Sequence, residues 1–182
     1  MDRGEISYRN YLSGDDQGLS ELIETYKESL TLYLNSLTGD ILLAEEMMEE
    51  TFVKLAVKKP RFAGKSSFKT WLYAIGRHTA EDGLRRRSRQ EALPLESLPD
   101  EADEEASLEE KILREERRIA LHQSMKQLPA DYRQILYLSY FEELSNPELQ
   151  QVLGLSKRQV ENRLSRARAS LKKLLSQEDL FS

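Results

Sequence analysis

The residues best suited to binding chemistry lie near the C-terminus, between positions 157 and 173. Seven basic side chains stand there against a single acid, Glu161. Arginine can donate two hydrogen bonds to guanine, asparagine can bind adenine in the same way, and glutamate can accept a hydrogen bond from the amino group of cytosine. A segment that combines these residue types with excess positive charge is typical of a surface that reads duplex DNA.

Helical spacing separates these polar residues from a hydrophobic stripe. At 100° per residue, Val160, Leu164, Ala167 and Leu171 lie on one side of a helix. The candidate DNA-binding residues lie opposite and on the flanks: Lys157, Arg158, Glu161, Asn162, Arg163, Ser165 and Arg166. Arg158, Asn162 and Ser165 face directly away from the stripe and suit base contacts. Lysine and arginine at the edges, Lys157 and Arg163 among them, suit phosphate contacts that position the helix without reading sequence.

Two helix-start signals and one turn signal surround this segment. Ser145 with Glu148, and Ser156 with Gln159, each have the spacing of a capping box. Gly154 stands between them, where a tight turn needs a residue that tolerates positive φ. The pattern therefore predicts a helix-turn-helix whose second helix enters the major groove. An ordinary helical hairpin with a polar face would share part of the pattern, but the caps, the turn and the charge together favour the helix-turn-helix.

The net charge of −5 conceals a strong segregation along the chain. Ten acids face one lysine between 15 and 50, and eleven acids face two basic residues between 90 and 116. Seven basic residues face two acids between 65 and 89, and the C-terminal segment 157–173 is again basic. Two basic stretches predict contact with a polyanion at two places, and the acidic stretches leave surface for a basic partner.

Hydrophobic periodicity predicts three helices in the first half of the chain. The first covers 19–37 and ends at a glycine, and the second covers 41–57 and ends before a proline. A short loop leads to a third helix, capped by Ser66 or Ser67, that continues with basic residues to position 89.

An acidic stretch, 90–112, contains two prolines and little periodicity, so we expect an extended, self-repelling linker. Helical patterns resume at 119–128 and 131–141, before the helix-turn-helix. The sequence therefore predicts an all-α fold with two small helical domains, 1–89 and 113–182, joined by a flexible acidic linker.

Composition excludes several classes of protein. The chain has no cysteine, so a disulfide framework and a cysteine zinc site are excluded, and the isolated His78 and His122 cannot alone form a four-ligand site. We expect His122 to be an ordinary helix residue. No nucleotide-binding glycine loop, HExxH motif or cysteine nucleophile is present, so we expect neither an enzyme nor a cofactor or metal. The longest apolar runs are a few residues, so we expect a cytoplasmic protein without membrane insertion.

Two blocks of the sequence resemble a known family. Residues 44–87 resemble the second conserved region of bacterial group IV (extracytoplasmic function, ECF) sigma factors of the sigma-70 family, and residues 125–175 resemble their fourth region. Both blocks occur in the family's order and are joined by a linker, which is more specific than a helix-turn-helix alone. The resemblance implies an alternative sigma factor that binds core RNA polymerase and directs transcription initiation from promoters with −10 and −35 elements.

The resemblance also implies roles for particular residues. The positions matching the site that docks on the coiled coil of the largest polymerase subunit are Glu46, Met47, Glu49 and Glu50. Those matching the −10 site are Phe62, Ala63, Gly64, Lys65, Ser66, Arg77, His78 and Arg85. A small loop with basic neighbours suits a base extruded from single-stranded DNA. The implied partners are core polymerase, which would bring the chain to the nucleoid, promoter DNA and, as a further candidate, an anti-sigma factor.

The chain departs from the family pattern at two of these positions. His78 stands where the family often has asparagine, and Glu161 where it often has a basic residue, so the family's base preferences do not carry over. We expect Trp71 to be a core residue, because it shares a helix face with Phe68 and Ile75.

The alternative interpretation is a free-standing helix-turn-helix DNA-binding transcriptional regulator. Such a protein would need a dimer surface and a palindromic operator. The acidic stretches oppose tight binding by the free chain, because they repel the phosphates that dominate affinity for DNA. Transcription by core polymerase from a defined promoter would separate the two interpretations.

Overall fold

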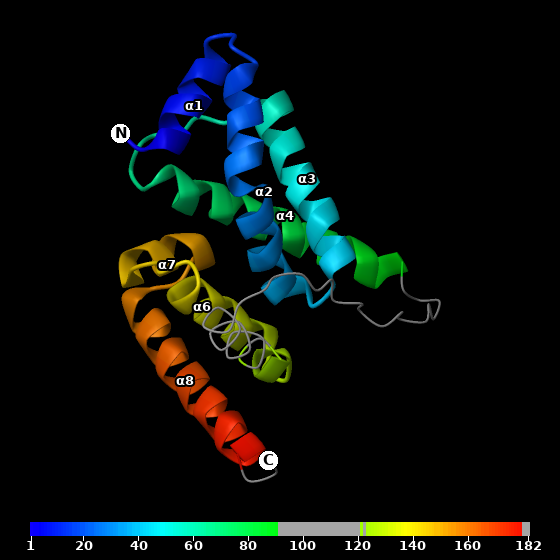
Figure 1. Ribbon diagram of the computed structural model, residues 1–182, viewed down its shortest axis with the longest axis vertical. Coiled ribbons are helices and arrows are strands. Elements are labelled where there is room, and N and C mark those ends of the chain that lie inside the picture. The colour runs from blue at the N-terminus through cyan, green and yellow to red at the C-terminus, as the bar shows by residue number, and fades with distance from the viewer. Residues whose placement is uncertain (91–120, 122, 180–182) are drawn as a thin grey trace, which may run out of the picture.

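The computed structural model describes residues 1–90, 121 and 123–179, and within these ranges it contains helices and no strands (Figure 1). The helices with defined bounds are α1 (Arg3–Leu12), α2 (Gln17–Thr38), α3 (Ile41–Lys58), α4 (Phe68–Gln90), α6 (Ala130–Tyr140), α7 (Asn146–Leu153) and α8 (Lys157–Asp179). The predicted all-α class is confirmed. The predicted linker and His122 lie outside the described residues. Within the described part, no helix is long and apolar enough to cross a membrane.

Helices α1, α3 and α4 pack around the hydrophobic face of α2. Helices α2 and α3 run side by side, and α4 crosses them both (Figure 1). Leu30 and Leu34 of α2, Leu55 of α3, and Phe68 and Leu72 of α4 are fully buried in this core. The amphipathic spacing that predicted α2, α3 and α4 therefore also produces their packing.

Backbone caps set the boundaries of these helices. Gly39 adopts a left-handed conformation that ends α2, and the Asp40 carboxylate then accepts hydrogen bonds from the first amides of α3. The cap of α4 is Ser67 rather than Ser66, because the Thr70 amide donates to Ser67 Oγ at 3.1 Å. The Asp2 carboxylate also accepts a hydrogen bond from the Phe68 amide, at 2.8 Å, and so ties the N-terminus of the chain to the start of α4.

Helix α1 was not predicted from hydrophobic periodicity. It buries the rings of Tyr8 and Tyr11, whose hydroxyls donate to the carbonyls of Pro60 and Ala56 at 2.6 and 3.0 Å. Asp2 caps this helix by accepting from the Glu5 amide. An acidic cap followed three residues later by glutamate is a start signal that could have revealed the helix.

Helices α6, α7 and α8 form a second packed unit around Leu136, Leu149 and the α8 stripe. Both capping boxes are confirmed by reciprocal hydrogen bonds, and Gly154 makes the turn between α7 and α8 at φ 64°. The predicted stripe is confirmed, since the exposed fractions from the first member to the last are 0%, 4%, 0% and 8%: Val160, Leu164, Ala167 and Leu171.

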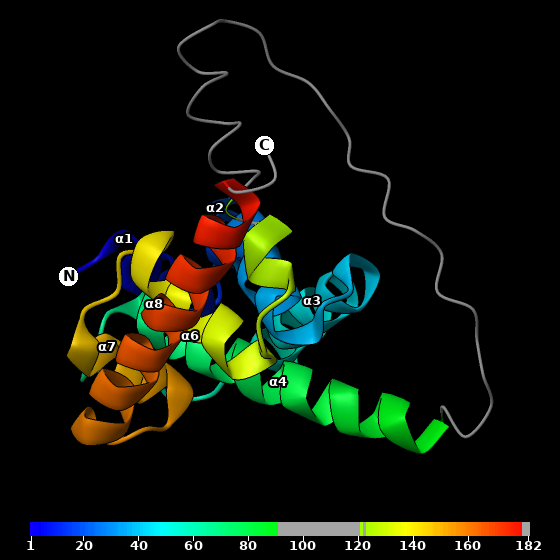
Figure 2. The ribbon, with the colours of Figure 1, turned by 90° about the horizontal axis from the view of Figure 1, so that it is seen from below.

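The two groups of helices also pack against each other. Helix α6 contacts α2, and α7 contacts α4, so that the second unit lies along one side of the first (Figure 2). The sequence predicted two units but contained no indication of this contact. This contact determines how the two candidate DNA-binding sites are spaced.

Candidate nucleic-acid interface and docking surface

The exposed side of α8 carries the predicted base-reading residues. Arg158, Asn162 and Ser165 are exposed, on the side opposite the buried stripe, and Glu161 is exposed beside them. The Ser156 cap fixes where the helix begins, and packing of the stripe fixes its rotation, so the backbone presents these side chains outward together. The geometry is that of a recognition helix with an accessible polar face.

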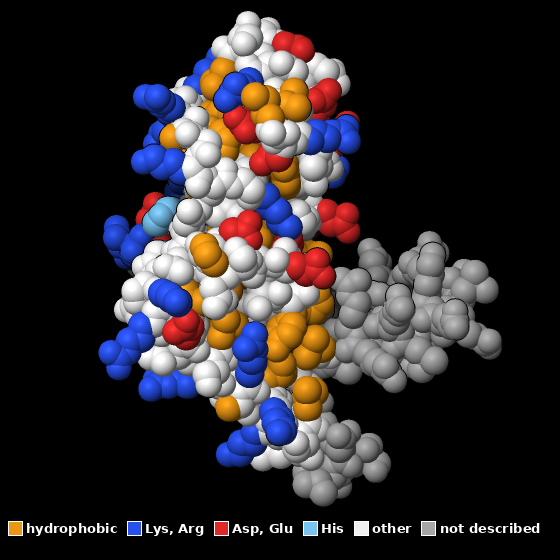
Figure 3. All heavy atoms as spheres, turned by 90° about the vertical axis from the view of Figure 1, so that its left-hand side faces the viewer, with side chains coloured by type: hydrophobic (Ala, Val, Ile, Leu, Met, Phe, Trp, Pro, Cys, Tyr) orange, Lys and Arg blue, Asp and Glu red, His pale blue; other side chains and the backbone are white. Residues whose placement is uncertain are grey.

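Basic side chains flank this face. Lys157 and Arg166 are exposed, whereas Arg163 is half-buried, with its guanidinium 3.8 Å from the Asp131 carboxylate. The side of the molecule that carries α7 and α8 shows Lys and Arg side chains along one edge, with few acids between them (Figure 3). A row of this kind suits the phosphate backbone of DNA.

Tyr140 and Asn146, which the sequence pattern did not indicate, support the interface. Arg168 Nε donates to the hydroxyl of Tyr140 at 3.1 Å, and the guanidinium lies 5.8 Å from the centre of the ring, so Tyr140 orients a candidate phosphate contact. Asn146, at the start of α7, shares an open hollow of about 400 Å³ with Ser165 and Arg168. The capping box at Ser145 was the signal that α7 begins at this place.

The loop before α4 is accessible at its tip and anchored at its base. Ala63, Gly64 and Lys65 are exposed. The half-buried ring of Phe62 lies 5.1 Å from that of Trp71, which is itself partly buried and packs against the core rather than lying within it. The anchored base and accessible tip give a small loop of defined position.

The candidate −10 residues on α4 lie beside acids of the same helix. Arg77 pairs with Glu81 at 2.8 Å, and the exposed His78 lies 3.7 Å from the same carboxylate. Arg85 donates to Asp82 at 2.5 Å, and this hydrogen bond lowers the pKa of the Asp82 carboxyl. Among the described residues, the buried Nε of Arg77 has no hydrogen-bond partner. Ser66, the last residue of the loop set, is half-buried and donates to the carbonyl of Ser67 at 3.2 Å.

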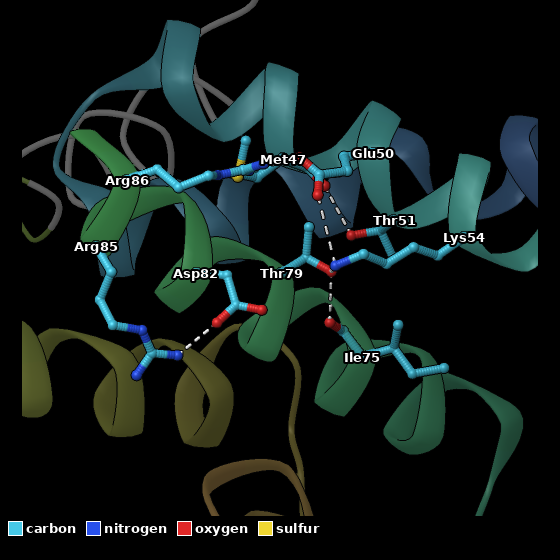
Figure 4. Close-up of polar contacts among 9 residues, drawn as sticks. All are labelled: Met47, Glu50, Thr51, Lys54, Ile75, Thr79, Asp82, Arg85 and Arg86. Carbon is cyan, nitrogen blue, oxygen red and sulfur yellow. Dashed lines mark hydrogen bonds and ion pairs between the residues drawn. The ribbon is translucent and has the colours of Figure 1, made fainter. Parts of the chain in front are cut away.

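The four predicted docking residues of α3 fall into two groups. Glu46 and Glu49 are exposed, whereas Met47 is 1% exposed and packs against Gly83 of α4. Glu50 is half-buried and pairs with Arg86 at 2.8 Å, which lowers the pKa of its carboxyl (Figure 4). Met47 and Glu50 therefore hold α3 against α4, and Glu46 and Glu49 form the accessible part of the set.

Exposed hydrophobic residues extend this surface of α3. Leu42, Val53 and Val57 are 72%, 56% and 76% exposed, and their spacing aligns them with Glu46 and Glu49 on one side of the helix. The spacing was visible in the sequence, but exposure of these residues was not. An acidic and apolar helix face of this kind suits a partner that offers basic and apolar side chains.

Comparison with known proteins agrees with this arrangement. Residues 22–90 match the family Sigma-70 region 2, and residues 118–171 match the family Sigma-70, region 4. The chain is 31% identical to RNA polymerase sigma-H factor of Pseudomonas aeruginosa, over 89% of this chain and 88% of that protein. It is 26% identical to ECF RNA polymerase sigma factor SigW of Bacillus subtilis, over 89% of this chain and 91% of that protein.

A solved structure shows a similar arrangement of helices. CnrH in complex with the cytosolic domain of CnrY superposes with a TM-score of 0.67 at 25% sequence identity, covering 96% of this chain and 98% of CnrH. The family matches occur in the order predicted from the sequence, and they contain α3, the loop before α4, and α8 as far as residue 171. The chain therefore belongs to the sigma-70 family of RNA polymerase sigma factors, in the extracytoplasmic function group.

Proposed function

We propose that this chain binds core RNA polymerase and directs initiation by holding a −10 base at the loop 62–66 and reading the −35 duplex with α8. The observation that carries this proposal is the presence of two separate accessible surfaces with DNA-binding chemistry in one chain. One is the exposed face of α8, and the other is the anchored loop with its basic neighbours on α4. A bipartite promoter requires two such surfaces.

Core polymerase would dock on the exposed side of α3. Its acids provide charge complementarity to a basic partner, and the neighbouring valines and leucine provide area to bury. The role is non-catalytic, because the polymerase supplies the chemistry of transcription. We place this action in the cytoplasm, at nucleoid DNA when the polymerase is bound.

An anti-sigma factor is a further proposed partner. CnrH was solved with the cytosolic domain of CnrY bound to it, and this chain shares its fold over nearly the whole length. A protein that covered the exposed side of α3 would compete with polymerase for the same acids and apolar side chains.

Charge reversal on α3 tests the docking surface. Glu46→Lys together with Glu49→Lys should weaken affinity for core polymerase by about tenfold or more, since complementary charge is replaced by repulsion. Melting temperature should stay near that of the wild type, because both residues are exposed. Glu50 is left unchanged, since its ion pairs with Arg86 and Lys54 would mix docking with folding.

The matched control is reversal of Glu24 and Glu28, two exposed acids on α2 with similar spacing. Affinity can be measured by fluorescence titration of labelled protein with core polymerase. Equal losses in both double variants would indicate a general charge effect, and unchanged affinity in the α3 variant would exclude this docking surface.

A further inference from the structure

The loop before α4 has little hydrogen-bonded structure of its own. Within the described part of the chain, residues 60–66 form no backbone–backbone hydrogen bond. Lys59 at φ 44° and Gly64 at φ 69° adopt the left-handed conformation, which turns the chain at the start and near the middle of the loop. A site that must hold a base in one place needs support, so the position of this loop depends on contacts from other elements.

Helix α1 supplies such a contact at the start of the loop, beside which it lies (Figure 1). The Tyr8 side chain belongs to a residue that is only 1% exposed, and its hydroxyl donates to the carbonyl of Pro60 at 2.6 Å. Burial raises the pKa of this hydroxyl to about 12, so it stays protonated and remains a donor at neutral pH. The hydrogen bond fixes the start of the loop against a buried ring.

The carboxylate of Asp2 supplies a contact at the other end of the loop. Its Oδ1 accepts from the Glu5 amide and caps α1, and its Oδ2 accepts from the Phe68 amide, each at 2.8 Å. One carboxylate therefore joins the first turns of α1 and α4. Gly4 permits this close approach, because a Cβ atom there would lie 2.6 Å from Cδ1 of Phe68.

Aromatic rings connect the two ends of the loop. The ring centre of Tyr8 lies 5.5 Å from that of Phe68 and 5.4 Å from that of Trp71. Phe62 of the loop packs on the same two rings, at 5.6 and 5.1 Å. Helix α1 therefore contacts the start of the loop, its end, and the rings on which its one aromatic side chain packs.

We propose that α1 braces the −10 loop, with Tyr8 and Asp2 as positioning residues that hold residues 62–66 in the geometry needed to bind an extruded base. The inference rests on the proposed function, because it requires a base to be held at this loop. Tyr8 is buried, and Asp2 directs both carboxylate oxygens at backbone amides, so both act through the loop. The match to Sigma-70 region 2 begins at residue 22 and does not contain α1.

Two tyrosines of α1 provide a matched pair of variants. Tyr8→Phe and Tyr11→Phe each remove one hydroxyl from a buried ring, but the Tyr11 hydroxyl donates to the carbonyl of Ala56, which belongs to α3 and not to the loop. Tyr11→Phe is therefore the control for loss of a hydrogen bond in α1. Asp2→Ala is the second test, because it releases the other end of the loop from an exposed position.

Limited digestion of the isolated full chain with trypsin measures the loop itself. Arg61 and Lys65 are exposed cleavage sites in the loop, and the rate of cleavage there follows the population in which the loop is loosened. Mass spectrometry of the fragments separates these cuts from cuts elsewhere. Loss of one hydrogen bond should raise the rate about fivefold in Tyr8→Phe and in Asp2→Ala. Tyr11→Phe should stay near the wild type.

Strand opening with core polymerase tests whether the brace matters for reading the −10 element. Tyr8→Phe and Asp2→Ala should each slow opening of the matched promoter about fivefold, because a loosely held loop fits the extruded base less well. Both should also discriminate less against promoters with substituted −10 bases. Discrimination at the −35 element and affinity for core polymerase should not change, since those sites lie on other helices. Tyr11→Phe should open the promoter as the wild type does.

Several results would overturn the proposal. Unchanged cleavage in both test variants would show that α1 does not hold the loop. Faster cleavage with unchanged opening and unchanged −10 discrimination would show that the brace does not serve recognition, and equal losses in Tyr11→Phe would show a general destabilisation of α1. A wild-type chain that opens no promoter with core polymerase would contradict the proposed function and the recognition role with it, while faster cleavage in the two variants would still show that α1 holds the loop.

Discussion

At the scale of single residues, the proposed recognition helix α8 would make two kinds of contact with DNA. Arg158 and Asn162 lie on the outer face of α8 and can form directional hydrogen bonds with base edges, whereas Lys157 lies at the start of the helix, where a phosphate would pass. Because one contact depends on sequence and the other does not, the two kinds of residue should fail differently.

Alanine substitutions distinguish these roles. Arg158→Ala or Asn162→Ala should cost about 1 to 3 kcal/mol on the preferred −35 sequence and reduce discrimination at one or two base positions. Lys157→Ala should weaken all sequences alike and reduce the salt slope by about one. A promoter-library selection with the polymerase holoenzyme measures both effects. Unchanged preference in the first two variants would remove α8 from the reading role.

A different result is expected at the proposed −10 loop, because an extruded base is available only after the strands separate. Lys65→Ala combined with His78→Ala should reduce formation of the open complex more than binding of the closed complex. Both side chains are exposed, so folding should be preserved. Permanganate footprinting reports strand opening, and gel-shift titration reports closed binding. Equal losses in the two assays would indicate a general electrostatic role.

The inward or outward position of a side chain could be predicted from the sequence where the spacing within one helix determines it. The inner and outer faces of α8 follow from spacing alone, and the structure confirms the buried stripe. The burial of Met47 and the pairing of Glu50 depend on Gly83 and Arg86, more than 30 residues away. Local periodicity contains no information about such partners.

At the scale of helices, α1 and α2 meet at a contact that only glycine permits. A Cβ atom at Gly18 would lie 2.2 Å from the Ser7 carbonyl oxygen and 2.8 Å from the Tyr11 amide nitrogen. Both obstacles are backbone atoms, which cannot rotate away. The approach brings Ser7 Oγ within 2.7 Å of the Glu21 carboxylate, to which it donates.

Gly18→Ala should therefore destabilise the fold, although alanine is normally the better helix former. We expect a loss of about 1 to 3 kcal/mol in unfolding free energy, as for other overpacked contacts, measured by urea denaturation. Ser20→Ala, at an exposed position of the same helix, is the control and should change little. A Gly18→Ala variant at least as stable as the control would contradict this packing.

Most helices were predictable because their hydrophobic spacing and their caps agree. The predicted ranges 19–37, 41–57 and 131–141 lie within two residues of α2, α3 and α6 at every end. Helix α1 was missed because it is short and its buried residues include glycine and serine, which give no apolar period. Its start signal at Asp2 would have been the better guide.

At the scale of the whole molecule, the packing of α6 on α2 and of α7 on α4 could not be predicted from the sequence. Tyr33 and Tyr73 fit the hydrophobic faces of their own helices, so nothing in the spacing indicates that Tyr137, far along the chain, stacks on them. The domain boundaries at 89 and 113 remain a prediction. The segregation of acidic and basic residues along the chain, in contrast, was visible in the sequence.

The free chain should bind promoter duplex weakly and without strong sequence preference. Its net charge is −5, and the acidic stretches oppose the phosphate contacts of α8. Addition of core polymerase should bring sequence specificity, measured by fluorescence anisotropy at physiological salt with matched and scrambled promoters. Equal preference with and without core polymerase would contradict this expectation.

Transcription with purified core polymerase tests whether this chain directs initiation from promoters. In a run-off assay with this chain as the only added factor, templates from a promoter library should yield transcripts from a defined start site. Those transcripts should require both a −10 and a −35 element, and scrambling of either should abolish them. No transcript above the level of core polymerase alone, together with nanomolar, sequence-specific binding by the free chain, would contradict the account and support an autonomous DNA-binding regulator.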